Sequence, residues 1–422
     1  MMDEVDDVAE PFQRVAALDL GKAELTACVR LPHPDKPGRR VQEVRVCSTL
    51  TPALLGLADW LRAERVQVVA MEATSDYWKP VYYLLEAEGF TCWLLNARHV
   101  KNAPGRPKTD RLDAVWLAKV TERGMCAPSL VHPKPIRRLR DLTRYRRTLV
   151  RDRTRAKQRL EKLLEDAQIK LSSVISNVWG VSGRAMLEAM IAGERSPRVL
   201  AELAKGSMRG KIPLVTEALT GHFEEHHAFL ARRMLDRVDA ITREIDDLTA
   251  RIEETIVPFE AQVTRLDEIT GLGRIGAQEL IAEIGIDMTR FPSPAHLVSW
   301  AKYAPIDKKS AGKGKAGATG KGNGWLGGTL GEAAASAART RTFLGDRYRR
   351  IARRRGKGRA NVAVGNSILK IVWHLLSDPD ARYSDLGADF YRTHVNTRHR
   401  QRNLIRQLEA VTGQKVTLKP AA

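Results

Sequence analysis

The sequence has few cysteines and no long apolar run. Its four cysteines show no CxxC spacing, which excludes a zinc ribbon or a disulfide framework and indicates free thiols in a reducing compartment. No stretch reaches the ~18 apolar residues that a membrane-spanning helix needs. The first residues, MMDEVDDVAEP, are acidic where a signal peptide would be basic and then apolar. We therefore expect a cytoplasmic protein with no membrane contact, in which residues 1–12 form a short disordered lead.

Acidic residues are the minority among the charged ones. Lys and Arg number 70 against 50 Asp and Glu, so the formal net charge is +20 and the isoelectric point is about 10.0. An excess of this size favours a polyanionic partner, above all nucleic acid, with an affinity that falls steeply with salt. The hydrophobic content of 43% is that of a folded globular protein. A chain of 422 residues is expected to form two or three domains.

Residues 13–128 alternate between strand-like and helix-like patterns. The β-rich runs RVAALDLG and AELTACVR meet at Gly21 and Lys22, which is the spacing of a hairpin, and VQEVRVCSTL is a third strand. A helix, a strand, a helix, a strand and a last helix beginning at Asp110 follow. The order β-β-β-α-β-α-β-α predicts an α/β domain: a mixed sheet whose first three strands form a meander, with helices packed on it.

Residues 129–256 are expected to form a helical domain built on two long helices, at 135–169 and at about 226–256. In the second, apolar residues from Met234 to Ile252 recur in steps of 4, 3, 4, 3 and 4, which predicts a coiled-coil seam. We expect the two helices to pair with each other or across a dimer.

The first of these long helices is unusually basic. Eleven positions between residues 137 and 159 are Arg or Lys, opposed only by Asp141 and Asp152. One interpretation is a solvated face beside a coiled-coil partner. The other is a surface that contacts nucleic-acid phosphates, because cations at this density repel one another without a polyanion.

Residues 257–400 are expected to form a mostly helical C-terminal domain, followed by a tail at 401–422. The segment ITGLGRIGAQELIAEIG, with Gly271, Gly273 and Gly276, has the pattern of a helix-hairpin-helix, whose exposed N–H groups suit a phosphate. A flexible Gly/Lys loop, DKKSAGKGKAGATGKGNG, follows; it contains no G-x-x-x-x-G-K-[ST] motif, which excludes ATP binding of the Walker type. The segment RYRRIARRRGKGR predicts a second basic surface.

Four carboxylates stand at the ends or beginnings of predicted elements. Asp19 lies near the end of the first strand, Glu72 ends the fourth, and Asp110 and Asp113 open the last helix. Separately, each has an ordinary interpretation: a turn residue, a neighbour of the cap formed by Thr74, Ser75 or Asp76, or a salt bridge to Arg111. In a ribonuclease-H-like fold, all four would converge. Their mutual repulsion would then require cations, and two Mg²⁺ ions at a phosphodiester are the interpretation we favour.

The motifs LDLGK, MEATSDYW, NARHVKNAPGRPKTDRLDA and ITGLGRIGA…SAGK…TGKGNGWL resemble those of the DEDD transposases of the insertion sequence 110 family. The resemblance covers nearly the whole chain. It implies a resolvase-like N-terminal domain with a ribonuclease-H fold, a coiled-coil middle and a C-terminal transposase domain. It also implies that Asp19, Glu72, Asp110 and Asp113 bind the metal ions.

The same resemblance implies a serine nucleophile in the C-terminal domain, which holds DNA as a phosphoserine. Three serines compete. Ser293 lies between prolines and is typical of a helix N-cap, and Ser299 lies in a helical stretch. Ser310, in the lysine-rich loop, is best placed to reach a phosphate. Two departures from the family pattern are that Ala311 separates Ser310 from Gly312 and that Gly327 replaces an arginine.

The family further implies a guide RNA that pairs with target and donor DNA, and dimers that pair into a tetramer, with the serine of one subunit completing the carboxylate site of another. A nucleoid-associated enzyme of this kind needs many phosphate contacts. The residues predicted to contact nucleic acid are Arg106, Lys108, Arg137, Arg138, Arg144, Arg147, Arg151, Arg155, Gly273, Lys313, Lys321, Asn323, Arg353 and Arg354.

The sequence therefore predicts an RNA-guided DNA recombinase that uses Mg²⁺ and Ser310. The main alternative is a Mg²⁺-dependent junction nuclease in which Ser310 is an ordinary loop residue. A basic RNA- or DNA-binding scaffold without activity is a second. An actin-like ATPase is disfavoured because the C-terminal half has no second phosphate-binding hairpin.

Overall fold

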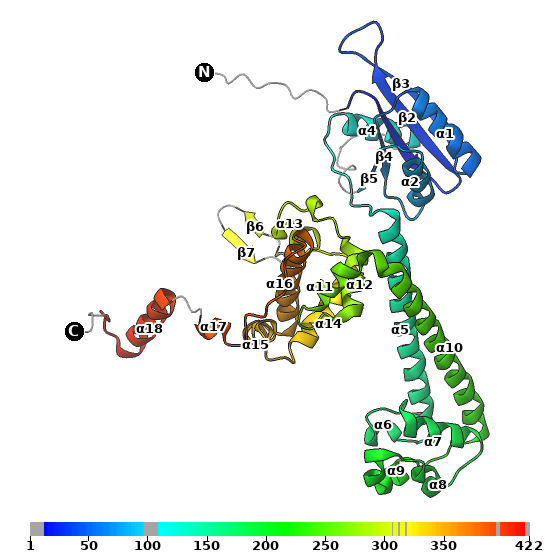
Figure 1. The fold of residues 1–422 in the computed structure, drawn as a ribbon, viewed down its shortest axis with the longest axis vertical. Coiled ribbons are helices and arrows are strands. Elements are labelled where there is room, and N and C mark those ends of the chain that lie inside the picture. Colours follow the sequence, from blue (N-terminus) through cyan, green and yellow to red (C-terminus); the bar gives the residue numbers. More distant parts are fainter. Residues whose placement is uncertain are drawn as a thin grey trace. The chain divides into compact units, whose positions relative to one another are not determined.

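The computed structural model describes residues 12–96, 109–305, 307–310, 313–316, 319–393 and 397–417. For 307–310, 313–316, 392–393 and 397–400 it describes the backbone alone. The chain divides into two compact units, Met1–His132 and Pro133–Ala422, which are described separately (Figure 1). No helix in these described ranges is both long and apolar enough to cross a membrane.

The first unit is a five-stranded mixed sheet with helices, and the predicted order of strands and helices is confirmed. Strand β1 pairs antiparallel with β2 and parallel with β4, so the sheet order is β3-β2-β1-β4-β5. The elements are β1 (Val15–Leu20), β2 (Glu24–Pro32), β3 (Arg40–Ser48), α1 (Thr51–Ala63), β4 (Val68–Glu72), α2 (Trp78–Ala87), β5 (Cys92–Leu95) and α4 (Asp110–Glu122).

Both faces of the central strands are buried. Alternate residues of β1 point to opposite sides of the sheet. Ala16 and Leu18 join the core that contains residues of α1 and α2, whereas Val15 and Ala17 join the core that contains residues of α4. Because β1 and β4 are covered on both faces, their sequences are nearly continuous apolar runs, and a polar residue at their ends is therefore exceptional.

The end of α4 is fixed to the sheet by a buried ion pair. Glu122 is 1% exposed and accepts a hydrogen bond of 2.6 Å from Nε of Arg30 on β2. Its other oxygen pairs with Arg40 at the start of β3. Two arginines thus neutralise one buried carboxylate, and this contact fixes the position of α4 along β2 and β3.

Glu122→Gln is expected to destabilise the first unit by about 3 kcal/mol, because it leaves two nearly buried arginines without their charge partner. Thermal unfolding of the variant and of Glu43→Gln measures the effect. Glu43 forms an exposed pair with Arg45, so its loss should cost under ~1 kcal/mol. Equal stability of the two variants would contradict the anchoring role of Glu122.

The second unit contains the two predicted long helices, α5 (Lys134–Asp166) and α10 (Glu225–Ile256), which run antiparallel beside each other (Figure 1). The predicted seam is buried: Val238, Ile241 and Ile245 pack with Leu149 and Ala156 of α5. The pairing of the two helices within one chain is therefore confirmed, while a coiled-coil supertwist stays a prediction.

Short helices connect the far ends of α5 and α10 and close a separate apolar core with them, in which Leu160 and Met186 are fully buried. These elements are α6 (Leu171–Val174), α7 (Val181–Ile191), α8 (Pro197–Glu202), η1 (Gly206–Lys211) and α9 (Ile212–Ala218).

The rest of the second unit is mostly helical, as predicted, and contains one two-stranded hairpin. Helices α11 and α12 meet at a tight turn, as the helix-hairpin-helix pattern predicted. Gly271 in this turn has φ 89°, and a Cβ there would lie 2.5 Å from the carbonyl oxygen of Ala333. The elements are η2 (Val257–Phe259), α11 (Glu260–Asp267), α12 (Gly273–Ile284), η3 (Met288–Arg290), α13 (Pro294–Trp300), β6 (Asp307–Ser310), β7 (Lys313–Ala316), α14 (Gly324–Ala337), α15 (Phe343–Arg355), α16 (Lys357–Ser377), α17 (Phe390–Thr393) and α18 (Thr397–Thr412).

Candidate active site and nucleic-acid interface

Two of the four predicted carboxylates stand side by side at one end of the sheet. Strands β1 and β4 are parallel, with Ala17 opposite Ala70 and Leu18 opposite Met71, so the next positions in this register are Asp19 and Glu72. Both are partly buried. Since alternate residues share a face, they continue the face of Ala17 and Ala70, which is the face that α4 covers.

The other two carboxylates open the helix that covers this face. Helix α4 packs on β1 and β2. Asp110 and Asp113 lie in its first turn, on the same side as Ala114 and Leu117, which are buried against the sheet. Thr109 is the N-cap, accepting a hydrogen bond of 3.3 Å from the Leu112 amide. Acids at this helix end also interact favourably with the helix dipole, which is a second physical reason for their presence.

The capping interpretation of the segment after Glu72 does not hold. Helix α2 has Tyr77 as its N-cap and no side-chain cap, so Thr74, Ser75 and Asp76 do not cap it. Instead the chain turns through Ser75, which has φ 48°, a strained value for a residue with a Cβ.

No three His, Cys, Asp or Glu side chains in the part of the chain that the structure describes lie close enough together to hold a metal ion. The donor chemistry still fits Mg²⁺, because all four predicted ligands are carboxylates, and two of them are held in register on neighbouring strands. Convergence of the four carboxylates therefore stays a prediction.

The three competing serines occupy different environments. Ser310 ends β6, with Lys313 of β7 as its register partner, so the predicted flexible loop contains an antiparallel hairpin. Ser293 is the N-cap of α13, as predicted, but its Oγ lies 2.8 Å from Nδ1 of His296. Ser299 lies exposed on α13. The contact with His296 gives Ser293 a neighbouring base that the sequence reasoning did not consider.

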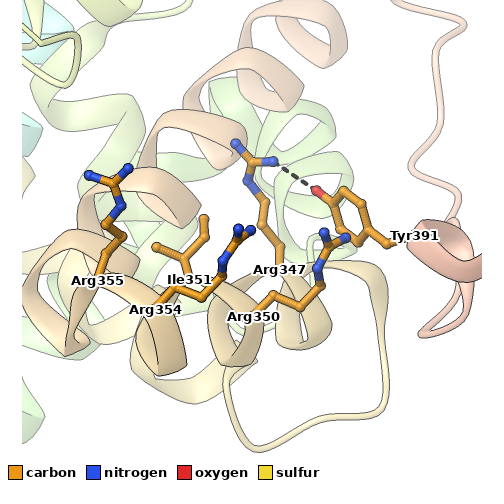
Figure 2. A pocket seen from close by; sticks show the side chains of 6 residues that line it. All are labelled: Arg347, Arg350, Ile351, Arg354, Arg355 and Tyr391. Carbon is orange, nitrogen blue, oxygen red and sulfur yellow. Dashed lines mark hydrogen bonds between the residues drawn. The ribbon is translucent and has the colours of Figure 1, made fainter. Parts of the chain in front are cut away.

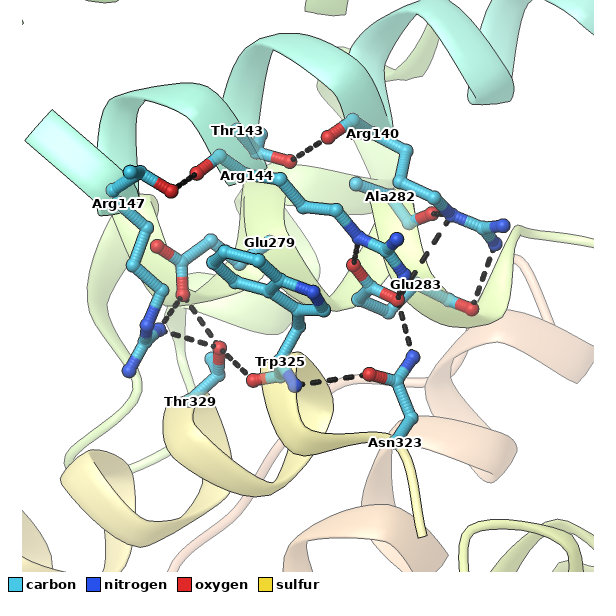
Figure 3. Close-up of polar contacts among 11 residues, drawn as sticks. Arg140, Thr143, Arg144, Arg147, Glu279, Ala282, Glu283, Asn323, Trp325 and Thr329 are labelled. Atoms are coloured by element: carbon cyan, nitrogen blue, oxygen red, sulfur yellow. Dashed lines mark hydrogen bonds and ion pairs between the residues drawn. The ribbon is translucent and has the colours of Figure 1, made fainter. Parts of the chain in front are cut away.

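The basic helix α5 meets two acids of α12 (Figure 3). Arg144 donates two hydrogen bonds to Glu283, of 2.7 and 2.8 Å, and Arg140 donates to the carbonyl oxygens at the same helix end. Arg147 donates to Glu279 and Thr329, and it is 9% exposed. One face of the basic helix is therefore neutralised inside the protein.

Asn323 joins this network from the segment that follows the hairpin. Its side-chain carbonyl accepts from the Trp325 amide and caps α14, while its amide donates to Glu283 over 2.5 Å. Trp325 in turn lies under the guanidinium groups of Arg144 and Arg151, with ring-centroid distances of 5.6 and 5.1 Å. Glu283 thus ties α5 and α12 to the start of α14.

Most of the residues predicted to bind nucleic acid fall into two groups: those engaged inside the protein and those exposed to solvent. Arg144, Arg147 and Asn323 are engaged within the protein, so any contact with nucleic acid would have to compete with Glu279 and Glu283. The exposed members of the set are Arg138, Arg151, Arg155, Lys321, Arg353 and Arg354, and Arg137 is partly buried.

The remaining members of the set carry less structural information. Gly273 begins α12, with φ 70° and open space where a Cβ would lie. Only the backbone of Lys313 is considered, and Arg106 and Lys108 lie outside the described residues.

Glu279 and Glu283 are structural residues that the sequence reasoning missed. They stand four residues apart on α12, separated by Leu280, Ile281 and Ala282, and are 9% and 2% exposed. Their spacing matches that of Arg140, Arg144 and Arg147 on α5, because residues three and four apart share a helix face. Two acids at this spacing within an apolar run were the available indication of a buried partner for the basic helix.

Glu283 is expected to make stability depend on pH. Burial raises the pKa of its carboxyl, but Arg144, Arg140 and Asn323 together hold the pKa below the ordinary value of 4.5. A lowered folded-state pKa stabilises the protein above the ordinary pKa, and this stabilisation is lost as pH falls below 4.5 through the folded value. At neutral pH, Glu283→Gln should therefore destabilise the second unit by about 3 kcal/mol, and the difference should shrink on acidification.

Urea unfolding at a series of pH values tests this, with Glu254→Gln as the control. Glu254 forms an exposed i,i+3 pair with Arg251, so its replacement should change the unfolding free energy by under ~0.5 kcal/mol. A Glu283→Gln deficit that does not change between neutral and acidic pH would show that lost charge pairing is not its cause.

The sequence matches two family models. Residues 16–169 match a DEDD transposase model, described as "Transposase", and residues 263–349 match "Transposase IS116/IS110/IS902 family". Together the two matches span more than half of the chain and define a transposase. The chain belongs to the IS116/IS110/IS902 family, as the motifs predicted.

Other similarities are weak. No curated protein matches the sequence. Among solved structures, a Thermus thermophilus RuvC structure is similar, with 15% identity and a TM-score of 0.22, over 28% of this chain and 100% of its own.

Proposed function

We propose that the protein is an RNA-guided DNA recombinase of an insertion sequence, with a ribonuclease-H-like first unit. Membership of a transposase family supports DNA as the substrate. The observation that carries the proposal is the register of β1 and β4, which puts Asp19 and Glu72 next to each other on the face covered by α4. Carboxylates on neighbouring strands, at the ends of runs that are otherwise apolar, suit a site for cations.

The proposed metal ligands are Asp19, Glu72, Asp110 and Asp113. Two Mg²⁺ ions would supply charge neutralisation at a scissile phosphate and polarise its oxygens. The two strands hold Asp19 and Glu72 in fixed register, and the first turn of α4 carries the other two, so approach of this helix end to the strand ends would complete the site. The anchor at Glu122 fixes the opposite end of the same helix.

Mg²⁺ is expected to stabilise the first unit against thermal unfolding, because it binds the folded carboxylates and not the unfolded chain. A concentration a hundredfold above the dissociation constant would contribute about 2.7 kcal/mol. Asp113→Asn should lose this gain. Asp59→Asn, at an exposed pair with Arg62 on α1, should retain it. An equal gain in both variants would remove the metal assignment, whatever the catalytic activity.

Ser310 is the proposed nucleophile. Its Oγ would attack the phosphorus, form a new P–O bond and release its proton, while the bond to the leaving strand oxygen breaks and leaves a hydroxyl on that strand. Attack by a strand hydroxyl on the phosphoserine would reverse the exchange and reseal DNA. The lysines around β6 and β7 supply positive charge for the phosphate.

A guide RNA is the proposed source of sequence specificity. The exposed arginines of α5 and α15 can neutralise phosphates, but phosphate contacts position nucleic acid and do not read its sequence. The carboxylates and Ser310 belong to different compact units of the chain. Dimers that pair into a tetramer, in which the serine of one subunit completes the carboxylate site of another, are therefore part of the proposal.

The decisive experiment combines the protein with Mg²⁺, the element's non-coding RNA and labelled junction DNA, and detects a protein–DNA adduct on denaturing gels. Wild type is expected to form the adduct. Ser310→Ala should form none because the nucleophile is gone, and Asp113→Asn should reduce it at least a hundredfold, in line with loss of transition-state charge stabilisation.

Ser293→Ala is the matched control, since Ser293 is the serine with a histidine partner. An adduct that persists in Ser310→Ala and disappears in Ser293→Ala would transfer the nucleophile to Ser293. Nicked DNA without an adduct, unchanged in both variants, would instead identify a metal-dependent junction nuclease.

A further inference from the structure

A hollow of about 420 Å³ lies between α15 and α17 (Figure 2). Arginine side chains from successive turns of α15 point to the same side of the helix, and one aromatic ring closes the end of the hollow. We call it the arginine pocket; its lining residues are Arg347, Arg350, Ile351, Arg354, Arg355 and Tyr391.

Tyr391 orients two of these arginines. Its hydroxyl accepts a hydrogen bond of 2.7 Å from Nη1 of Arg347, and the Arg350 guanidinium lies 4.0 Å from its ring centroid. The ring also stacks on Phe343, at 5.3 Å and an interplanar angle of 18°. A ring held by these neighbours is a support for the arginines and not an open platform for a base.

Arginines greatly outnumber acids on the helix that lines the pocket. Helix α15 contains six arginines and one aspartate. In the described ranges, no carboxylate forms an ion pair with Arg350, Arg354 or Arg355, and the buried Nε of Arg347 has no hydrogen-bond acceptor. Arg349, by contrast, donates to two backbone carbonyl oxygens. Like charges at i,i+4 repel, so several arginines kept on one face favour an anionic ligand.

We propose that the arginine pocket binds the phosphate backbone of an unpaired nucleic-acid strand. This inference rests on the proposed function in taking nucleic acid as the partner. A duplex backbone is convex and fits a flat basic surface, whereas a hollow of this volume admits one nucleotide and its flanking phosphates. The apolar side chain of Ile351 provides a surface for a sugar or base, and arginines on successive turns suit successive phosphates.

Fluorescence anisotropy with short labelled oligouridine, oligothymidine and a DNA duplex tests this over a range of salt concentrations. EDTA is present throughout, so binding is measured without cleavage. For single strands, the slope of log K against log salt should become shallower by about 0.7 for each of Arg350→Ala and Arg354→Ala. Duplex binding should change less. The difference in affinity between oligouridine and oligothymidine shows whether the pocket prefers RNA or DNA.

Tyr391→Phe separates orientation from charge. It removes the hydroxyl that holds Arg347 and leaves every arginine in place, so single-strand affinity should fall several-fold with an unchanged salt slope. Arg341→Ala is the charge-matched control, because Arg341 is exposed just before α15 and outside the pocket. Circular dichroism confirms that each variant is folded.

The inference would be overturned if the double variant Arg350→Ala/Arg354→Ala bound single strands with the same affinity and salt slope as Arg341→Ala. It would also be overturned if the double variant lost equal affinity for single strands and for the duplex. These outcomes do not depend on the carboxylates or Ser310. A chain that fails to form a DNA adduct can still show pocket-dependent binding, so failure of the proposed function and failure of this inference are distinguishable.

Discussion

The structure of the second unit depends on neutralising arginines that the chain itself places along one helix. Helix α5 packs on α12 where Glu279 and Glu283 meet Arg147 and Arg144, and both acids are nearly buried. An unpaired charge there would cost several kcal/mol, so the acids and arginines must be present together. Other arginines of α5, Arg138 and Arg155 among them, are exposed to solvent, and this division leaves them accessible to a polyanion.

The first unit also places charges of one sign near one another, but these charges are negative. Its sheet buries apolar residues on both faces and has Asp19 and Glu72 near the ends of β1 and β4, while Asp110 and Asp113 lie in the first turn of α4. The dipole of α4 offsets part of the repulsion between Asp110 and Asp113 in its first turn. Its effect falls off within a turn, so it stabilises acids on the strands less. The apolar residues of β1 and β4 are buried on both faces, so the core of the unit does not depend on these acids.

Local patterns explain why most of the fold could be predicted. Period-two runs and turn residues determined the strand order, and the spacing from Val238 to Ile245 determined which face of α10 is buried. The sequence also predicted Asp19 beside Glu72. Each residue lies at or near the end of a strand, and the two strands are neighbours inside the sheet. The spacing of Glu279 and Glu283 indicated a buried basic partner, but it did not identify Arg144, which is 139 residues away from Glu283 and is brought to it only by tertiary packing.

Separation of the proposed carboxylate site and the proposed nucleophile into different compact units has a physical consequence. Each unit has hydrophobic cores and buried ion pairs of its own. Under the proposed assignment, nucleic acid and further subunits would bring Ser310 to the carboxylates. The binding energy of the correct guide and DNA would then be used to assemble the reactive geometry. Under the proposed function, the exposed arginines would therefore contribute to the control of catalysis as well as to affinity.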